Sequence, residues 1–384
     1  MSRRPISLML VSYSYPPVLG GSEIEAQRVC AALLRRGYRV TVLCAGLPPM
    51  PEGREFTDPG GVPVRVIGRG TASKRLDARF ALGVAWNLWT ERRNYQLVYF
   101  LMQGLHLATG LPVARMLRKP VVMKFSGSSL IDAMRQSLVG RLELRWLRKW
   151  ARRVMILNSG MVEEATAAGI RKEQLLWMPN PVDTADFAPC RPEERLTLRS
   201  RLGIAAEALV VLYVGRLAPE KELGSLLGGF GAAAKEFPDA WLVLVGDGPE
   251  RGRLEAQAGA RVRFTGRVSI PEVCQWLQAS DVFALVSSNE GFPCSLTEAM
   301  SAGLSSVVSD IPANRQLIED GVHGLHAELQ SESSIAGALG QLLGDAELRA
   351  RMGAAARRRV VENYSTDQIL DRYEALFDEA LDAK

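Results

Sequence analysis

Short apolar runs alternate with longer amphipathic stretches along the whole chain, and this pattern restricts the fold more than any other feature of the sequence. Alternation of this kind is typical of βαβ units, in which helices cover both faces of a parallel sheet. The fold class is therefore predicted to be α/β. In the first half of the chain, strands are predicted over residues 6–11, 40–44, 62–67, 97–101, 120–123 and 154–157.

A second series of apolar runs restarts the same pattern further along the chain. Its predicted strands span residues 209–214, 241–245, 262–265, 282–286 and 305–308. Between the two series, proline and Asx residues crowd into residues 179–183, which is typical of a linker. A length of 384 residues also exceeds what one hydrophobic core usually organises. We therefore predict a first domain over residues 1–184, a second over 185–364, and a closing amphipathic helix over 365–384.

Charge is divided unevenly between the two predicted domains. Residues 1–183 hold 27 Lys and Arg against 13 Asp and Glu, a balance of +14, and the remainder holds 20 against 29, a balance of −9. A basic domain favours an anionic partner. The five cysteines are scattered and form no CxxC pair, which is typical of a reducing compartment and argues against structural zinc. No apolar run reaches the length of a membrane span, so a cytoplasmic protein is predicted.

Two loops that follow predicted strands carry groups suited to binding an anion. Gly20-Gly21-Ser22 precedes a predicted helix, where backbone N–H groups and the helix dipole can receive phosphate. A glycine pair can equally be a tight turn. Arg216 and Lys221 follow the strand that ends at residue 214, at the edge where α/β sheets bind ligands. They can neutralise a diphosphate leaving group, and solvated surface charge is the equal alternative.

The segment between Glu290 and Glu298 carries the most chemical information. Glu290-Gly291-Phe292 follows a predicted buried strand and leads into a helix whose first N–H groups can bind phosphate. The two carboxylates can accept hydrogen bonds from sugar hydroxyls. A structural alternative exists, because Ser295 and Glu298 have the spacing of a capping box. A capping box would explain Glu298 and leave Glu290 unexplained.

Taken in order, these motifs resemble glycosyltransferase family 4, a large family of retaining transferases with the two-lobed GT-B fold. The resemblance covers essentially the whole chain, and the order and spacing of the segments carry it. The matching segments are residues 20–21, 214–221, 245–249, 264–268, 290–298, 310–312, 319–321 and 324–325. The resemblance implies two Rossmann-like domains that face each other across a cleft, with the last helix crossing back to pack on the first domain.

The resemblance also implies roles for individual residues in binding a nucleotide-sugar donor. Arg216 and Lys221 would grip the donor diphosphate, and Glu298 would hold the ribose hydroxyls. Glu290, together with the N–H groups of Gly291 and Phe292, would orient the transferred sugar. The implied catalytic residues are therefore Glu290, Arg216 and Lys221.

Further contacts complete the implied sugar-donor site. Leu296 and Thr297 would offer backbone N–H groups to the phosphates, and Val268 would lie beside the nucleobase. The loop of Gly20 and Gly21 would contact the sugar donor from the first domain. A UDP-sugar is the first expectation for this donor, and a GDP-sugar is the second.

One departure from the family pattern follows the strand that ends at residue 123. Relatives often carry a histidine there that contacts the donor sugar, and this chain has Ser126 in that slot. Ser126 is therefore the candidate sugar contact from the first domain. The three histidines of the chain are dispersed and are predicted to be structural: His106, His323 and His326.

No Asp-x-Asp motif occurs, so the acidic clamp that usually holds a divalent metal on a diphosphate is missing. We predict that Arg216, Lys221 and helix N-termini supply that positive charge, with no metal and no cofactor. The resemblance implies a retaining displacement on one face of the sugar, in which the departing phosphate helps deprotonate the acceptor hydroxyl. A double displacement is the alternative.

A predicted helix over residues 141–153 carries arginines along one face: Arg141, Arg145, Arg148 and Arg152. Trp146 and Trp150 flank these cations, an arrangement that suits an anionic lipid surface. A solvated helix whose late cations offset the C-terminal dipole is the equal alternative. The charge balance of the first domain favours a lipid-linked or glycan acceptor, bound at the inner face of the membrane.

Two other classes of function fit the sequence less well. A GT-B scaffold that binds a nucleotide sugar or a protein partner without turnover is the alternative to an enzyme. Intact Arg216, Lys221, Glu290 and Glu298 argue against this scaffold. Binding of nucleic acid would require aromatic stacking platforms among the cations, and the sequence shows none.

Overall fold

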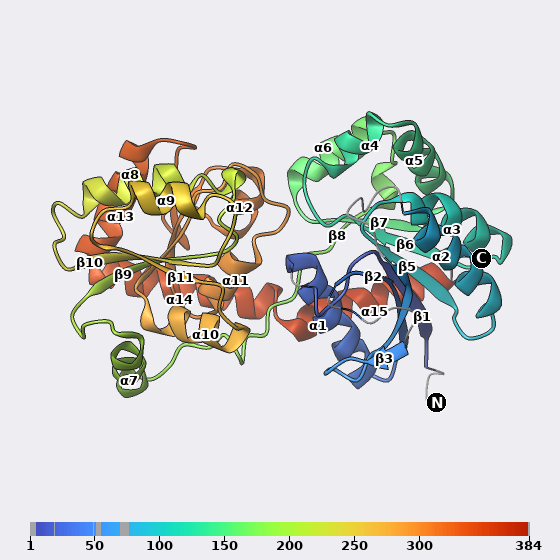
Figure 1. Ribbon diagram of the computed structural model, residues 1–384, viewed down its shortest axis with the longest axis horizontal. Helices are drawn as coiled ribbons and strands as arrows, with labels where there is room; N and C mark the ends of the chain where they lie inside the picture. Colours follow the sequence, from blue (N-terminus) through green and yellow to red (C-terminus); the bar gives the residue numbers. More distant parts are fainter. Residues whose placement is uncertain (1–4, 19, 49, 51–54, 70–76, 383–384) are drawn as a thin grey trace. The chain divides into compact units, whose positions relative to one another are not determined.

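The computed structural model describes residues 5–18, 20–48, 50, 55–69 and 77–382, and these form two compact units (Figure 1). The N-terminal unit comprises Met1–Pro181 and Thr366–Lys384, and the C-terminal unit comprises Val182–Ser365. The chain therefore passes between the units twice, after Pro181 and after Ser365. The boundary expected at residue 184 lies close to the first of these crossings.

The N-terminal unit is built on an eight-stranded sheet in the order β3-β4-β2-β1-β5-β6-β7-β8. All neighbouring strands are parallel except β3 and β4. Its strands are β1 (Ser7–Ser12), β2 (Arg39–Gly46), β3 (Glu55–Thr57), β4 (Pro63–Arg69), β5 (Leu97–Leu101), β6 (Val121–Lys124), β7 (Arg153–Ile156) and β8 (Leu175–Trp177). Its helices are α1 (Gly21–Arg35), α2 (Ala78–Thr90), α3 (Leu105–Met116), α4 (Leu130–Arg135), α5 (Leu138–Trp150), α6 (Ser159–Ala167), the 3-10 turn η1 (Lys172–Gln174) and α15 (Thr366–Asp382).

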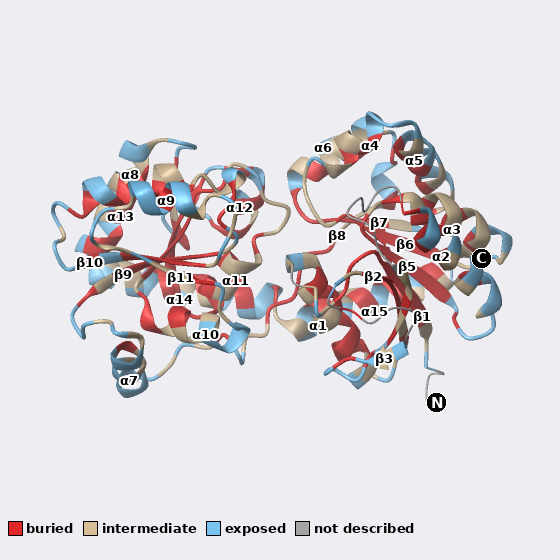
Figure 2. Ribbon diagram, in the orientation of Figure 1, coloured by how far each residue is buried: buried red, intermediate tan, exposed pale blue. Residues whose placement is uncertain are grey.

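The C-terminal unit holds a six-stranded parallel sheet in the order β11-β10-β9-β12-β13-β14. Its strands are β9 (Leu209–Val214), β10 (Ala240–Val245), β11 (Val262–Gly266), β12 (Val282–Leu285), β13 (Ser305–Ser309) and β14 (Gly324–Ala327). Its helices are α7 (Pro192–Leu202), the 3-10 turn η2 (Pro219–Lys221), α8 (Leu223–Ala233), α9 (Arg251–Gln257), α10 (Ile270–Ala279), α11 (Cys294–Ser301), α12 (Pro312–Leu317), α13 (Glu332–Gly344) and α14 (Ala346–Asn363). In both units the central strands are buried and the helices keep an exposed outer side (Figure 2).

The predicted α/β class is confirmed, and every strand predicted from the apolar runs is present. Three strands were not predicted, namely β3, β8 and β14. Each of them is only three or four residues long. In β3 and β14, polar residues interrupt the apolar run by which a buried strand is recognised.

The last helix, α15, completes the core of the N-terminal unit. Ile369, Tyr373 and Phe377 are buried in one cluster with side chains of α1, β1, β2 and β5. At the helix surface, the guanidinium of Arg36 lies 3.1 Å from the Asp367 carboxylate. The structure therefore confirms the prediction that the final helix returns to the first half of the chain.

A fully buried lysine lies in this core. Lys124, at the end of β6, donates to Glu25 Oε1 at 2.5 Å and to Asn180 Oδ1 at 2.8 Å. The Tyr373 hydroxyl lies 3.3 Å from the Lys124 ammonium and 3.1 Å from the Tyr99 hydroxyl. The Lys124 and Glu25 side chains are 0% and 3% exposed, so each charge depends on the other for compensation. The network joins α1, β6 and α15 to the segment that precedes the first crossing.

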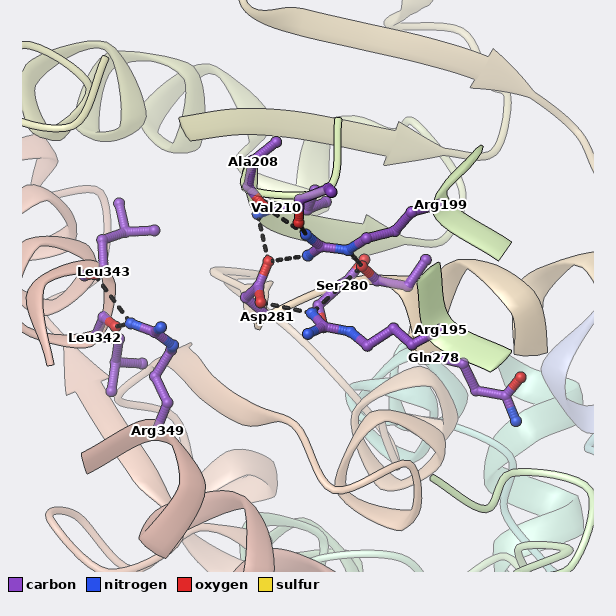
Figure 3. A network of polar contacts seen from close by, with 12 residues as sticks. Arg195, Arg199, Ala208, Val210, Gln278, Ser280, Asp281, Leu342, Leu343 and Arg349 are labelled. Carbon is purple, nitrogen blue, oxygen red and sulfur yellow. Dashed lines mark hydrogen bonds and ion pairs between the residues drawn. The ribbon is translucent and has the colours of Figure 1, made fainter. Parts of the chain in front are cut away.

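A second ion-pair network holds α7 against the body of the C-terminal unit (Figure 3). Arg199 on α7 lies 2.7 Å from Asp281 Oδ2 and donates to the Ala208 carbonyl at 2.9 Å. Arg195 binds the other Asp281 oxygen at 2.5 Å, and the Val210 N–H donates to Asp281 Oδ2 at 2.8 Å. These groups lie at the amino ends of β9 and β12. Ligands bind at the opposite edge of such sheets, so the network is structural.

His106 on α3 is a buried titratable group inside an apolar cage. Its ring stacks on Phe100 and meets Phe80 edge-on, so aromatic groups enclose it. Burial lowers the pKa of His106 from its ordinary 6.5 to about 4, and the nearby Met102 backbone offsets a part of this effect. The folded protein therefore holds His106 neutral at pH values where the unfolded chain is already protonated.

This difference predicts a pH dependence of stability. Because the unfolded chain takes up a proton near pH 6.5 and the folded chain only near pH 4, the free energy of unfolding should fall as pH is lowered through this window. We expect His106 to lower the free energy of unfolding by on the order of 3 kcal/mol across this window. Urea unfolding at pH 7, 5.5 and 4 measures this loss. The variant His106→Leu should show a flatter decline, and an equally steep decline would contradict the assignment.

Candidate active site

In each unit, one strand marks the point where the order of the sheet reverses. β9 lies between β10 and β12 in the C-terminal unit, and β1 lies between β2 and β5 in the N-terminal unit. In open α/β sheets, ligands bind in the crevice at the carboxyl ends of the strands on either side of this reversal. Most of the predicted site residues follow β1, β9 and β12, so the strand order brings them to these two edges. Ser126 follows β6 and Val268 follows β11.

An ion pair joins the loops that follow β9 and β12. Lys221 Nζ lies 2.7 Å from Glu290 Oε1, and the side chains are only 17% and 10% exposed. A second contact lies beside it, where the Ser288 N–H donates to the Glu220 carbonyl at 2.9 Å. The Ser288 hydroxyl lies 3.2 Å from the same oxygen. The structure therefore brings together a predicted cation and a predicted carboxylate that are 69 residues apart in sequence.

Arg216 is more exposed than Lys221. Its guanidinium pairs with Glu220 at 2.6 Å, and its side chain is 66% exposed. Its backbone is held by the Tyr213 hydroxyl, which donates to the Arg216 carbonyl at 2.9 Å. Burial raises the pKa of Tyr213, and the negative charges of Glu290 and Glu220 raise it further, so this hydroxyl keeps its proton. An anionic ligand would compete with Glu220 for the Arg216 guanidinium, and the Tyr213 hydroxyl would hold the loop that carries it.

Two glycines of the segment after β10 allow it to pack against the Arg216 loop. A Cβ atom at Gly246 would lie 1.9 Å from the Gly215 carbonyl oxygen, and one at Gly248 would lie 2.2 Å from the Leu217 carbonyl oxygen. The Leu217 N–H in turn donates to the Asp247 carbonyl at 3.0 Å. The two glycines of the matching segment 245–249 therefore have a structural role, because they allow two backbones to approach each other closely.

Helix α11 starts at Cys294, two residues earlier than a capping box with Ser295 as its N-cap would require. Its N-cap is Pro293, and no side chain caps the helix. Ser295 therefore lies within the first turn, and the capping-box alternative for Ser295 and Glu298 is wrong. Glu298 lies further along α11 and is half-buried. Its placement leaves the predicted contact with ribose hydroxyls as the hypothesis to test.

The backbone donors predicted for the phosphates are already engaged. The N–H groups of Leu296 and Thr297 donate to the Pro293 carbonyl at 3.0 and 3.2 Å. A phosphate at this helix start would have to share these groups. The neighbouring Phe292 ring lies 6.1 Å from the Tyr364 ring, measured between centroids, and Val268 is half-buried in the loop between β11 and α10. Gly291 is likewise half-buried.

In the N-terminal unit, a carboxylate of the protein itself lies at the start of α1. Glu23 is 6% exposed and accepts a hydrogen bond from the Ser14 hydroxyl at 2.5 Å. A Cβ atom at Gly20 would lie 2.2 Å from Glu23 Oε2, so glycine is what allows this carboxylate to fold back. A phosphate at Gly20 and Gly21 would have to displace it. The sequence analysis did not include Glu23 among the residues of this site. An acidic residue in the first turn of a helix is favoured near the free N–H groups there, and this signal could have identified it.

The other residues predicted for the N-terminal unit are placed as follows. Ser126 is half-buried in the loop after β6, at the carboxyl edge of the sheet that also carries Gly20 and Gly21. Among the histidines, His106 lies in the apolar cage described above, and His326 Nδ1 lies 3.0 Å from Asp310 Oδ1. Within the described ranges, no group of three or more His, Cys, Asp or Glu side chains is arranged to hold a metal ion.

Comparison with known proteins decides the family. The model of the glycosyl transferase 4-like domain matches residues 20–181, and the model of glycosyl transferases group 1 matches residues 194–359. The chain belongs to the group 1 glycosyltransferases. The two matches cover most of both units, and they agree with the family resemblance of the motifs. Its membership of this family identifies the protein as an enzyme.

Curated relatives align with this glycosyltransferase over almost its whole length. The phosphatidyl-myo-inositol mannosyltransferase of Mycolicibacterium smegmatis is 27% identical over 373 residues, which covers 92% of this chain and 88% of the relative. The GDP-mannose-dependent alpha-mannosyltransferase of Mycobacterium tuberculosis is 28% identical over 391 residues and covers 97% of each chain.

Solved structures confirm the GT-B fold. The Anabaena protein Alr3699/HepE, crystallised with UDP and glucose, superposes with a TM-score of 0.79 at 21% identity, covering 97% of this chain and 99% of that one. Sucrose-phosphate synthase from Thermosynechococcus elongatus gives a TM-score of 0.83 at 19% identity, with coverage of 99% and 100%. At such identities the likeness concerns the fold of the glycosyltransferase alone.

Proposed function

We propose that this glycosyltransferase moves a hexose from a nucleotide-diphosphate donor to an acceptor hydroxyl, with retention of configuration and without a metal ion. The observation that carries the proposal is the ion pair of Lys221 and Glu290, half-buried between the β9 and β12 loops. One partner offers a cation to a diphosphate, and the other offers a carboxylate to sugar hydroxyls. Arg216, on the same loop as Lys221, adds a second cation.

In the proposed reaction, the bond between the sugar C1 and the diphosphate oxygen breaks while the acceptor oxygen bonds to C1 on the same face. The acceptor proton passes to the departing diphosphate. Arg216 and Lys221 stabilise the negative charge that develops on the leaving group, which is electrostatic catalysis by preorganised cations. Glu290 and the N–H groups of Gly291 and Phe292 orient the sugar. Glu298 holds the ribose.

For the sugar donor, we propose GDP-mannose ahead of a UDP-hexose. The relatives that align over the whole chain are mannosyltransferases, and one is named for its dependence on GDP-mannose. The structures crystallised with UDP or UDP-glucose are only 21–22% identical to this chain. The order that we propose for the two sugar donors is the reverse of the order expected from the sequence.

For the acceptor, we propose a lipid-linked precursor that the basic N-terminal unit meets at an anionic membrane surface. The first 183 residues hold 27 basic against 13 acidic residues, and several relatives are named for phosphatidylinositol-type acceptors. No helix among the described residues is long and apolar enough to cross a bilayer. Contact with the membrane would therefore be made by surface residues of that unit.

The variant Glu298→Gln tests the proposed contact with the ribose. A carboxylate that accepts hydrogen bonds from hydroxyls contributes about 1.5–3 kcal/mol, so the affinity for the nucleotide sugar should fall by roughly 10- to 150-fold. Calorimetric titration with GDP-mannose measures the change. Glu347→Gln, at an exposed position of the same unit, is the matched control and should bind normally. Wild-type affinity in Glu298→Gln would remove Glu298 from the site.

Chelation tests the proposed absence of a metal ion. Because Arg216 and Lys221 supply the positive charge beside the diphosphate, turnover should be unchanged after dialysis against EDTA. Release of GDP from GDP-mannose, measured before dialysis, after dialysis and after re-addition of Mg²⁺ or Mn²⁺, gives the answer. Loss of turnover that either metal restores would contradict the assignment of charge to these two side chains.

A further inference from the structure

Helix α2 of the N-terminal unit is apolar on both of its sides. Phe80, Val84 and Leu88 are buried against the sheet and α3. On the opposite side, Leu82 and Trp86 are 66% and 68% exposed, and the exposed apolar set also includes Trp89 at 44%. Surface helices usually carry polar residues on the side that faces away from the core. An exposed apolar side of this kind indicates an interaction site.

The exposed side chains of α2 form a surface with the neighbouring helix. Leu82, Trp86 and Trp89 line an open hollow of about 680 Å³ together with Val113 of α3. Met116, one turn beyond Val113, is 70% exposed. We call this the α2–α3 apolar surface, defined by Leu82, Trp86, Trp89, Val113 and Met116. It lies wholly within the N-terminal unit, which carries the positive charge.

Arginines lie next to the α2–α3 apolar surface and at the ends of its helices. The guanidinium of Arg92 lies 5.4 Å from the centre of the Trp89 ring. Further exposed cations stand at the ends of the two helices: Arg79, Arg93, Arg115 and Arg118. The nearby acid Glu91 is already paired with Arg65 at 3.2 Å. The charges around the apolar surface are therefore complementary to an anionic partner.

We propose that the α2–α3 apolar surface docks this glycosyltransferase on an anionic lipid bilayer, with Trp86 and Leu82 inserted among the headgroups. Aromatic rings with polar edges favour the boundary between headgroups and acyl chains, and arginines beside them meet the lipid phosphates. The proposal rests on the proposed function only in that a lipid-linked acceptor brings the enzyme to such a surface. It identifies the residues that touch the bilayer.

The neighbouring helix α5 supplies a different component of the same docking. α3 packs against both α2 and α5, so the three helices form one layer. On α5, Arg141, Arg145 and Arg148 are exposed. The fourth arginine expected on this face, Arg152, lies beyond the helix, because α5 ends at Trp150 and the Arg152 N–H donates to the Val121 carbonyl. The arginines of α5 attract the bilayer over a distance, whereas α2 inserts into it.

The two components differ in their response to salt. Attraction between exposed arginines and lipid phosphates weakens as salt shortens the Debye length to about 3 Å at 1 M. Burial of apolar side chains does not depend on this screening. Vesicle binding should therefore have a part that salt removes and a part that salt leaves. The salt-resistant part should require Leu82 and Trp86.

Flotation with vesicles of phosphatidylglycerol and phosphatidylcholine, at 0.1 and 1 M NaCl, tests this division. We expect Leu82→Ser/Trp86→Ser to bind about tenfold more weakly at low salt and to lose the salt-resistant binding. Arg141→Gln/Arg145→Gln/Arg148→Gln should bind more weakly at low salt and keep the salt-resistant part. The matched control is Leu196→Ser/Trp241→Ser, which changes side chains 54% and 39% exposed in the other unit and should bind normally.

Two further measurements complete the test. Brominated lipids should quench tryptophan fluorescence in the wild type and less in the variant Trp86→Phe, which shows insertion directly. Release of GDP from GDP-mannose without vesicles should be unchanged in Leu82→Ser/Trp86→Ser, so a failure of the proposed transfer reaction would be seen separately. Equal vesicle binding by that variant and the wild type would overturn the proposal. A wild-type dimer that the variant dissociates would also overturn it, since the surface would then join two copies of this chain.

Discussion

Replacing Lys221 with Met is expected to lower kcat/KM for glycosyl transfer by about 10²- to 10³-fold, the usual effect of removing one preorganised charge-stabilising group. Lys221 is the cation that the structure holds most firmly at the β9 edge, since it is 17% exposed and lies 2.7 Å from Glu290. Arg216, the other predicted cation of this loop, pairs with Glu220. Initial rates with GDP-mannose and a lipid acceptor measure the loss.

The variant Glu290→Gln, alone and combined with Lys221→Met, shows whether the ion pair acts on the sugar donor or only supports the fold. If the two side chains act together on the sugar donor, the double variant should be hardly slower than either single variant. Lys235→Met, at an exposed position of the same unit, is the matched control and should retain full activity. A Lys221→Met enzyme with wild-type kcat/KM, or one that has lost its fold by circular dichroism, would contradict the assignment.

The variant Lys124→Met is expected to lower the free energy of unfolding of the N-terminal unit by about 3–5 kcal/mol. Lys124 has no exposed surface, and its loss leaves the Glu25 carboxylate buried with no compensating charge. The network also includes Asn180 and Tyr373, so the segment before the first crossing and helix α15 each lose a contact. Urea unfolding followed by circular dichroism measures the change.

The double variant Glu25→Met/Lys124→Met distinguishes two causes of the lower stability. Stability is lost either because the ion pair is removed or because the Glu25 carboxylate is left buried without a compensating charge. Apolar side chains of similar volume often replace a buried ion pair with little loss of stability. We therefore expect the double variant to recover most of the stability lost by Lys124→Met. Lys149→Met, at an exposed position of α5, is the matched control. A double variant less stable than Lys124→Met would contradict this account of the network.

The loops that carry Lys221 and Glu290 could be predicted from the sequence, because each of them follows a strand that is visible as an apolar run. The pairing of Lys221 with Glu290 follows from the adjacency of β9 and β12, which apolar runs do not show. In the same way, the contact of Lys124 with Glu25 joins residues 99 positions apart. Local patterns report which residues lie on a strand or helix. They do not report which distant residue will compensate a buried charge.

Helix ends and exposed apolar residues were harder to predict for physical reasons. The arginine spacing continues through Arg152, although the chain leaves α5 after Trp150 to start β7. Pro293 serves as the N-cap of α11, so a serine and a glutamate with capping-box spacing lie inside the helix. Leu82, Trp86 and Trp89 recur at helical spacing, as the residues of a core face do, and only the fold shows that this side of α2 is exposed.

A screen of nucleotide sugars tests the central claim most directly. The wild-type protein, Lys221→Met and Glu290→Gln are incubated with GDP-mannose, UDP-glucose and related sugar donors, with and without a lipid acceptor, and release of the nucleoside diphosphate is followed. We predict that the wild type releases GDP from GDP-mannose fastest, that the acceptor increases the rate, and that both variants are slower by about 10²-fold or more. Binding of a nucleotide sugar without release of its diphosphate under any of these conditions would contradict the enzyme and favour a non-catalytic scaffold.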